Sequence, residues 1–210
     1  MEIELKYTID DPAKVDQIFA DEEILLMRDA KKETQIPMHA VYYDTAEGDL
    51  RKERIAFRIR REGETCICTV KWGGSSEQGL HRRGEINVPV TDPAFLENPT
   101  LEVFQQSEIW DRLEKYVGKK LVPLLDMYFV RREIRLDNGK SISVFSIDQG
   151  EIQGNGKKLP ILELEIELFS GEESEILRIG EYVSRKYGLV PEDRSKFSRG
   201  WSLVQGEIRG

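Results

Sequence analysis

The chain contains few of the residues on which many catalytic and metal sites depend. Among its 210 residues are two cysteines and two histidines. Cys66 and Cys68 lie two positions apart on an expected strand, where a disulfide between them would be strained. With His39 and His81 they make a poor zinc set, and neither histidine has plausible partners for a Ser/His/Asp arrangement. Both cysteines are therefore interpreted as packing residues.

Long apolar runs are also absent. No stretch approaches the roughly 20 apolar residues that span a bilayer, so we expect no membrane contact. The formal net charge of −8 argues against non-specific nucleic-acid binding. The sequence has no G-x-x-x-x-G-K-[ST] phosphate loop and no nucleophile elbow. It begins directly in an expected strand, which argues against a signal or transit peptide and favours a cytoplasmic protein.

Charged residues, by contrast, make up 33% of the chain, and many of them recur with a period of two. Residues 2–7 read Glu-Ile-Glu-Leu-Lys-Tyr, and residues 163–168 read Glu-Leu-Glu-Ile-Glu-Leu. Successive side chains of a strand point to opposite faces, so each segment has one charged face and one apolar face. Several other segments repeat this pattern with charges of both signs. The repetition indicates a charged interior rather than a solvated exterior.

The patterns predict a mainly β protein of the α+β class. We expect about eight strands in a meander that closes into an antiparallel barrel, with helices packed outside, as a single domain over residues 1–210. Strands are expected at 2–9, 39–44, 55–61, 65–72, 82–90, 127–137, 141–148 and 161–169, with a flexible loop at 73–79 and a hairpin turn at 138–139. Helices are expected after Asp10, around Leu50, from Pro93, capped by Ser107, over 172–187 and over 195–203.

The charges on common strand faces fall into two chemical groups. The cations are Lys6, Arg58, Arg60, Lys71, Arg83, Arg131 and Arg135. The carboxylates are Glu2, Glu4, Glu85, Glu133, Asp148, Glu163, Glu165 and Glu167. A triphosphate carries about four negative charges, and arginine and lysine replace the hydration that it loses on binding. Carboxylates in the same cavity would repel it unless a metal lay between them. Mg²⁺ and Mn²⁺ take such oxygen ligands, so the mixture fits a metal–polyphosphate complex.

The order of these motifs resembles that of the CYTH superfamily, also called the triphosphate tunnel metalloenzymes. The resemblance extends from residue 2 to about residue 204. It rests on the E-x-E-x-K start, Tyr42-Tyr43-Asp44-Thr45, Phe57-Arg58-Ile59-Arg60, Thr69-Val70-Lys71, Arg83-Gly84-Glu85, Asp148-Gln149-Gly150, the Glu163/Glu165/Glu167 row and Ser195-Lys196-Phe197. The resemblance implies an eight-stranded antiparallel tunnel that binds triphosphate substrates with a divalent metal.

Carried over by position, the resemblance also implies residue roles. The implied phosphate-binding cations are Lys6, Arg58, Arg60, Lys71, Arg83, Arg131 and Lys196. The implied metal-side carboxylates are Glu2, Glu4, Glu163 and Glu165, supported by Glu85 and Asp148, with Glu167 at or beyond the edge of the metal sphere. A second metal, or a carboxylate such as Glu4 or Glu165, would activate the attacking water, and Lys71 and the arginines would stabilise charge on the phosphoryl group. A register slip of one residue would place Arg132 in the tunnel instead of Arg131.

The chain is most similar to bacterial inorganic triphosphatases, so the favoured function is hydrolysis of inorganic triphosphate to diphosphate and phosphate. The alternatives are a class IV-type adenylate cyclase, a thiamine or nucleoside triphosphatase, and a non-catalytic polyphosphate-binding module. The charged rows would also fit solvated strand faces, and Lys196 would fit an exposed helix. No aromatic pair for a base is evident, although Trp72 near the tunnel mouth offers one ring. The oligomeric state stays open, and a homodimer through an outer helix is compatible with the pattern.

Overall fold

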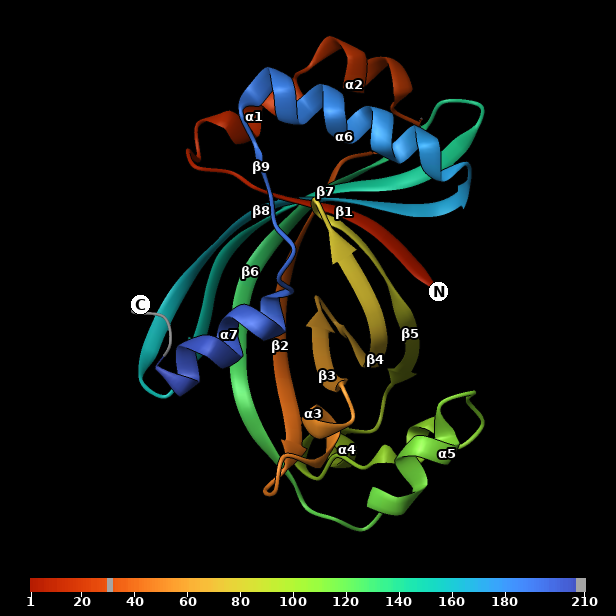
Figure 1. The fold of residues 1–210 in the computed structure, drawn as a ribbon, viewed down its shortest axis with the longest axis vertical. Coiled ribbons are helices and arrows are strands. Elements are labelled where there is room, and N and C mark those ends of the chain that lie inside the picture. The colour runs from red at the N-terminus through yellow and green to blue at the C-terminus, as the bar shows by residue number, and fades with distance from the viewer. Residues whose placement is uncertain (30–31, 207–210) are drawn as a thin grey trace.

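Eight long strands form the body of the protein in a computed structural model that describes residues 1–29 and 32–206 (Figure 1). They are β1 (Glu2–Thr8), β2 (Thr34–Thr45), β3 (Ile55–Glu62), β4 (Thr65–Glu77), β5 (Leu80–Val90), β6 (Leu121–Asp137), β7 (Ser141–Gly154) and β8 (Lys157–Gly171). A short ninth strand, β9 (Val190–Pro191), pairs with the end of β1. No helix within these described residues is long and apolar enough to cross a membrane.

The strands close into an antiparallel barrel, as the sequence predicts. Their order is β5-β4-β3-β2-β6-β7-β8-β1, and β1 also pairs with β5. The connectivity differs from one continuous meander. β2 to β5 form one meander and β6 to β8 another, and the two meet where β2 pairs with β6. β1 fills the remaining gap between β8 and β5, so the first strand of the chain closes the barrel.

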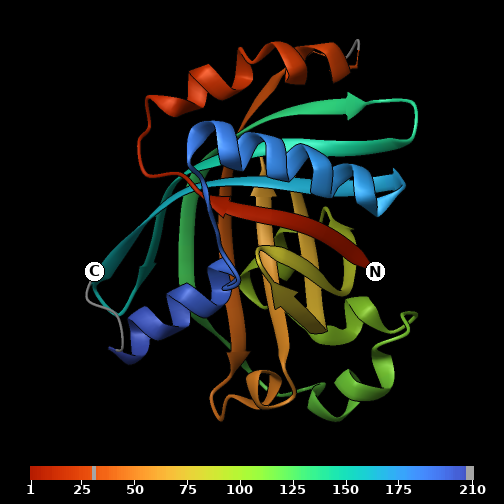
Figure 2. The ribbon, with the colours of Figure 1, turned by 45° about the horizontal axis from the view of Figure 1, so that its top comes forward.

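Two sets of helices cover the outer face of the barrel. α1 (Lys14–Phe19), α2 (Glu22–Met27) and α6 (Glu173–Tyr187) lie over β1, β7 and β8 (Figures 1 and 2). The short helices α4 (Pro93–Glu97), η1 (Leu101–Phe104), α5 (Trp110–Leu113) and η2 (Glu114–Tyr116) lie between β5 and β6 in the chain, after α3 (Asp49–Lys52). Residues from η1 and α5 pack on the outer side of β3 and β4. Burial of these two apolar clusters holds the outer layer to the barrel.

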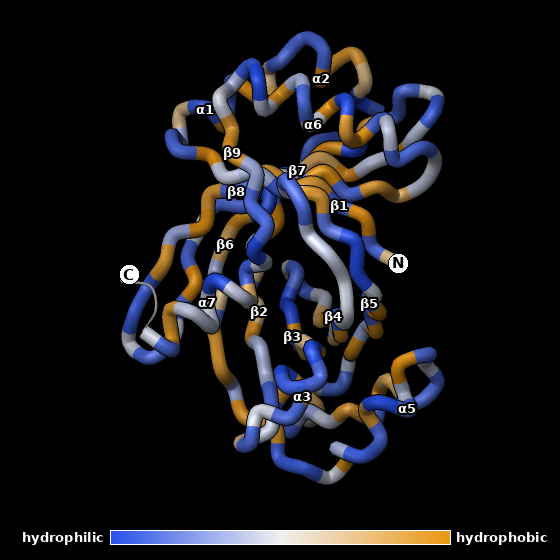
Figure 3. Tube along the Cα trace, viewed as in Figure 1, coloured by the Kyte–Doolittle hydropathy of each residue, from blue (hydrophilic) through white to orange (hydrophobic). Residues whose placement is uncertain are grey.

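The alternation of side chains along the strands explains why the interior stays polar. Leu5 and Tyr7 point outward into the cluster beneath α6, while Glu4 and Lys6 point inward and are buried. Figure 3 shows hydrophobic and hydrophilic residues alternating along the strands. Gly180 allows α6 to approach closely, because a Cβ there would lie 2.6 Å from Leu5 Cδ1. The period of two therefore places the charged side chains inside the barrel and packs the apolar side chains beneath the outer helices.

One helix departs from the expectation that all helices pack outside. α7 (Lys196–Gln205) begins after Ser195, whose Oγ accepts a hydrogen bond from the Ser198 amide. Phe197 and Val204 pack against a third apolar cluster formed by residues that face into the barrel, and Phe197 stacks on Tyr42 at 4.9 Å. Because the apolar face of α7 packs on inward-facing residues, the first turn of this helix lies inside the barrel.

Several local expectations are corrected. Residues 73–77 belong to β4 rather than to a flexible loop, and the hairpin turn lies at Gln78-Gly79. A second helix, α2, follows α1 and was not expected. α5 begins at Trp110, and the Ser107 hydroxyl donates to the Phe104 carbonyl instead of capping it. The packing role of the cysteines is supported, because both are free and Cys68 is buried in the outer cluster.

Candidate functional site

A charged cavity of about 80 Å³ lies inside the barrel. Side chains from seven of the long strands and from the start of α7 line it. We call it the tunnel cavity. Its charged lining residues are Glu2, Glu4, Lys6, Arg58, Arg60, Lys71, Arg83, Glu85, Arg131, Glu165, Glu167 and Lys196. Charges of both signs therefore share one enclosed space, where low local dielectric strengthens their interactions.

The pairing of β1 with β5 builds one wall of the tunnel cavity. Glu2 lies opposite Arg83 in the register, and Arg83 Nε donates to Glu2 Oε2 at 2.5 Å. Arg83 Nη2 also donates to Glu4 Oε1 at 2.7 Å. Lys71 on β4 lies 2.8 Å from Glu2 Oε1 and 2.6 Å from Glu85 Oε2. Each carboxylate on this wall is therefore fixed by at least one cation from a neighbouring strand.

Glu165 is the centre of the wall formed by β8, which pairs with β1. Lys6 Nζ lies 3.0 Å from Glu165 Oε1, Lys196 Nζ lies 2.8 Å from the same oxygen, and Arg131 Nη2 donates to Oε2 at 2.5 Å. Burial of Glu165 opposes its ionisation. The three cations outweigh that effect and hold the pKa of Glu165 well below its usual value. This carboxylate is therefore ionised at neutral pH.

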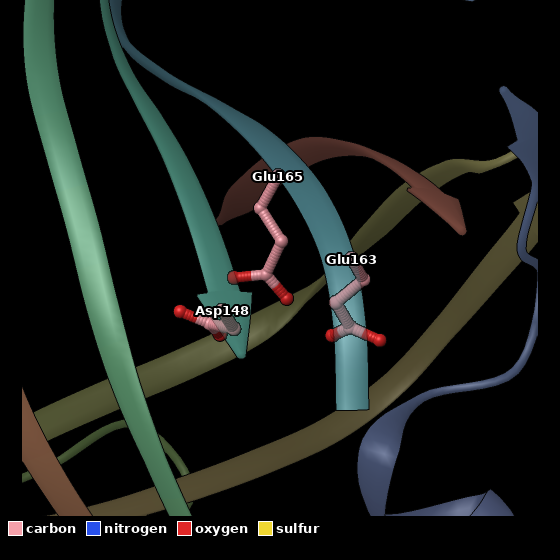
Figure 4. A group of neighbouring side chains, drawn as sticks. All are labelled: Asp148, Glu163 and Glu165. Atoms are coloured by element: carbon pink, nitrogen blue, oxygen red, sulfur yellow. The ribbon is translucent and has the colours of Figure 1, made fainter. Parts of the chain in front are cut away.

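A compact acidic group lies next to this wall. Asp148 on β7 and Glu163 and Glu165 on β8 each place one carboxylate oxygen within 4.8 Å of the others (Figure 4). Lys196 contacts all three, at 2.8 Å from Asp148 Oδ2 and in a close ion pair with Glu163. Arg199, one turn further along α7, pairs with the other oxygen of Glu163. α7 thus supplies the positive charge that compensates three buried carboxylates.

Two arginines on β3 face the middle of the cavity with few carboxylate partners. Arg58 is buried, its Nη2 donates to Thr69 at 3.2 Å, and its Nε has no hydrogen-bond partner among the described residues. Burial and the nearby guanidinium groups of Arg58 and Arg131 lower the pKa of Arg60, despite its ion pair with Glu62. Positive charges crowd together here, as expected of a site prepared for an anion.

The pKa of Tyr42 reflects the same excess of positive charge. Burial alone would raise the pKa of its hydroxyl, but Arg58, Lys71, Arg83 and Lys196 together lower it. The negative side of the cavity behaves in the opposite way. Burial, with the charges of Glu2 and Glu4, raises the pKa of Glu167 to about 7. The cavity therefore has a surplus of cations near Tyr42 and a surplus of carboxylates near Glu167.

The structure places most of the predicted site residues in this cavity. Those that line it are Glu2, Glu4, Lys6, Arg58, Arg60, Lys71, Arg83, Glu85, Arg131, Glu165 and Lys196. Asp148 and Glu163 do not line it and lie buried behind Lys196. Arg131 rather than Arg132 faces inward, because Arg132 pairs with Glu33 and Asp16 outside the cavity.

Two residues near the charges were not assigned a role from the sequence. Tyr42 lines the cavity, and Arg199 pairs with Glu163. Glu167, which the sequence placed at or beyond the edge of the metal sphere, lines the cavity as well. Tyr42 lies in a noted motif, two residues from inward-facing Ala40 on β2. Arg199 follows Lys196 by three positions, a spacing that places two side chains on one side of a helix. That spacing is the signal by which Arg199 can be found in the sequence.

Comparisons with known proteins give a consistent result. A family described as "CYTH domain" matches residues 1–201. The chain is 28% identical over 162 residues to an inorganic triphosphatase of Haemophilus influenzae, an alignment that covers 77% of this chain and 44% of that protein. The chain therefore matches less than half the length of this curated relative.

Solved structures share the fold. A Hippeastrum protein described as a putative adenylyl cyclase with a dominant triphosphatase activity aligns with a TM-score of 0.73 and 22% identity, over 97% of this chain and 96% of that one. A putative adenylate cyclase of Bacillus halodurans aligns with a TM-score of 0.59 and 17% identity, over 95% and 96% of the two chains.

Proposed function

The chain belongs to the CYTH domain family, and from this premise we propose that it is a divalent-metal-dependent triphosphatase. The favoured substrate is inorganic triphosphate, cleaved to diphosphate and phosphate. The observation that carries this proposal is Arg58, a buried guanidinium in the tunnel cavity whose Nε has no partner among the described residues. A buried N–H donor left without an acceptor is costly unless an acceptor oxygen joins it. A phosphate oxygen is the anion that the neighbouring arginines fit best.

The carboxylates in the cavity and directly behind it fit a hard divalent cation. Asp148, Glu163 and Glu165 have the oxygen spacing of a ligand set. Two residues further along β8, the pKa of Glu167 is raised by burial and by its acidic neighbours, and a cation there would relieve this repulsion. We propose Glu2, Glu4, Glu163 and Glu165 as the holding residues, with Glu85 and Asp148 in support. A bound Mg²⁺ or Mn²⁺ supplies charge neutralisation of the phosphate oxygens and a more acidic water.

The cations bind and orient the substrate in this proposal. Arg58, Arg60 and Arg131 lie on β3 and β6, and Lys71 and Arg83 lie on β4 and β5, so a linear triphosphate inside the barrel meets donors from several strands. Lys6 and Lys196 reach it from β1 and α7. Lys71 and the arginines stabilise the charge on the transferred phosphoryl group and on the departing diphosphate. Because their strands are fixed by the barrel, these donors need little reorganisation.

Glu4 and Glu165 are the proposed catalytic carboxylates. Burial opposes ionisation of Glu4, but Lys6 and Arg83 outweigh burial and the repulsion from Glu165, and the pKa of Glu4 falls. Glu165 is held ionised by its own cations. Both carboxylates accept hydrogen bonds at neutral pH and are available to orient the attacking water. The single-domain organisation and the cytoplasmic location stay predictions.

The test compares several substrates under different metal conditions. We would measure phosphate and diphosphate release from inorganic triphosphate, ATP and thiamine triphosphate, each with Mg²⁺, Mn²⁺ or a chelator. The proposal expects metal-dependent cleavage of inorganic triphosphate to diphosphate and phosphate. Diphosphate with a cyclic nucleotide from ATP would assign a cyclase. Tight triphosphate binding with no turnover of any substrate would assign a binding module and end the triphosphatase proposal.

A further inference from the structure

A second cavity of about 380 Å³ adjoins the tunnel cavity and reaches solvent at Arg54, which is exposed. We call this second cavity the mouth. The two cavities share Lys71 and Arg83 in their linings, so an anion that enters the mouth meets cations of the tunnel cavity directly. Arg51 and Arg54 line the mouth but not the tunnel cavity. Among the residues that the structure describes, no carboxylate lines the mouth, although the whole chain has a formal net charge of −8.

Three of the four cations in the mouth already have carboxylate partners. Lys71 and Arg83 pair with glutamates of the tunnel cavity. Arg51 Nε donates a hydrogen bond to the buried Asp44 at 2.8 Å. Arg54, by contrast, makes no ion pair within the described parts of the chain. Its positive charge is therefore the one in the mouth that no neighbouring carboxylate of the described residues compensates.

The backbone of Arg54 adopts a conformation that does not favour arginine. Arg54 follows Glu53, the C-cap of α3, and its amide donates to the Arg51 carbonyl at 2.9 Å. Its φ of +57° lies in the left-handed region, where glycine is the usual residue after a helix. The other non-glycine residues with positive φ in the described ranges, Gln78 and Asn155, each precede a glycine in a hairpin turn. An arginine kept at the end of a helix where the backbone favours glycine indicates that its side chain has a use.

We propose that Arg54 is a capture residue, whose charge draws the polyphosphate anion to the mouth and raises its local concentration beside Lys71 and Arg83. This inference rests on the proposed function for the identity of the anion. A cleft lined by charges of one sign attracts an oppositely charged ligand over a distance, and the attraction grows with the charge of the ligand. The mouth therefore favours a triphosphate over the less charged diphosphate and phosphate that leave. Arg54 does not touch the reacting phosphoryl group.

The rival role for Arg54 is a direct, tight contact with the bound substrate. An exposed arginine holds a single ion pair weakly, because water competes for both charges. Arg54 also lies outside the lining of the tunnel cavity, where cations from several strands are already present. Salt separates the two roles, because attraction between exposed charges is screened beyond about 3 Å at 1 M salt, whereas a contact in an enclosed cavity is screened much less. Capture therefore predicts a salt-dependent change in kcat/KM with an unchanged kcat.

The first arm of the test measures turnover of inorganic triphosphate in charge variants. Arg54→Gln and Arg54→Glu should lower kcat/KM about threefold and about tenfold at low salt, and the difference from wild type should vanish at about 0.5 M salt. Arg54→Lys should keep the wild-type kcat/KM, because the role needs only the charge. Arg54→Gly should lose kcat/KM as Arg54→Gln does, while unfolding at the same temperature as wild type or a higher one. Arg61→Gln and Arg61→Glu are the matched controls and should change neither parameter, because Arg61 is exposed on the outer side of β3.

The second arm measures binding without turnover. Calorimetric titration with inorganic triphosphate in chelator should give a Kd for Arg54→Glu that is raised about tenfold at low salt and equals the wild-type Kd at about 0.5 M salt. Equal kcat/KM values in Arg54→Glu and Arg61→Glu would overturn the capture role. A lowered kcat, or a loss that persists at high salt, would assign Arg54 a direct contact and would overturn it too. If inorganic triphosphate is not hydrolysed, the proposed function fails and the Kd values alone decide.

Discussion

The ammonium group of Lys196 lies 2.8 Å from Asp148 Oδ2, at a point where the aspartate has no exposed surface. The same ammonium also contacts Glu163 and Glu165. α7 is thereby anchored to the barrel interior by charge as well as by the stacking of Phe197 on Tyr42. One cation compensates charge on three buried carboxylates, so its removal should affect both folding and the site.

Lys196→Met should lower the free energy of unfolding by about 3–5 kcal/mol, because it removes a buried cation that contacts three buried carboxylates. Lys158→Met is the matched control. Lys158 pairs with Glu151 at the surface and is largely exposed, so its loss should cost less than about 1 kcal/mol. Urea denaturation of both variants measures the difference. Equal stabilities would contradict the structural role of Lys196.

Arg58→Met should weaken substrate binding without destabilising the fold. In the empty protein the buried guanidinium donates to Thr69 while its Nε has no partner among the described residues, and replacement of a buried charged group by an apolar side chain of similar length is often close to neutral for stability. Loss of charged hydrogen bonds to phosphate should raise the KM for inorganic triphosphate about ten- to a hundredfold. Thermal unfolding and steady-state kinetics measure the two effects. Arg61→Met, on the same strand but exposed on the outer side, should change neither. A large loss of stability in Arg58→Met would refute this view.

Glu165→Gln and Glu4→Gln should reduce turnover far more than binding. Each variant removes a charge proposed for metal and water, and keeps the shape of the side chain. We expect kcat for inorganic triphosphate to fall about a hundredfold or more, as for loss of an acid–base group. Calorimetric titration with inorganic triphosphate in chelator measures the binding that remains. Glu173→Gln, at the surface in a pair with Arg82, is the control. Wild-type rates in either glutamine variant would remove that glutamate from the site.

Stability should depend on pH through Glu167. Its native pKa of about 7 lies above the ordinary 4.5, so between these values the native state holds a proton that the unfolded state has released. The stabilisation linked to this proton is therefore present at acid pH and is lost as the pH rises to 7. Glu167→Gln should remove this loss, worth up to about 3 kcal/mol. Urea denaturation in chelator at pH 5 and pH 8 compares the slopes. Parallel pH dependence in variant and wild type would contradict the prediction.

The sequence predicted the barrel and the inward face of its strands because both follow from the period of two. Glu2, Glu4 and Lys6 face inward as the alternation requires, and the alternation of Arg58 and Arg60 with apolar residues places them inward too. Such a pattern determines which face of a strand points inward, but it does not determine how far along the barrel axis each side chain lies. For this reason Asp148 and Glu163 were grouped with the cavity, whereas they lie behind Lys196.

What the sequence could not predict depends on contacts between distant segments. The position of α7 follows from the fit of Phe197 and Val204 to inward-facing residues of other strands, and no local pattern reports such a fit. The choice of Arg131 over Arg132 was open for the same reason. Arg131 and Arg132 have the same intrinsic preference for a strand. They differ in their partners from other segments, which are Glu165 for Arg131 and Glu33 for Arg132.

The pairing of β1 with β5, which closes the barrel, determines when the site is assembled during folding. Glu2 and Glu4 sit on the strand that joins the two meanders, paired with Arg83 across the seam. During synthesis the first strand emerges long before β8, its other neighbour in the sheet. The contacts between β1 and β5 can form before β8 emerges, but Glu165 and Glu167 join them only with this last long strand, so no folding intermediate with an open barrel holds the complete site. A triphosphate that binds this site should bind only the closed barrel, and should therefore stabilise the protein only at the end of folding.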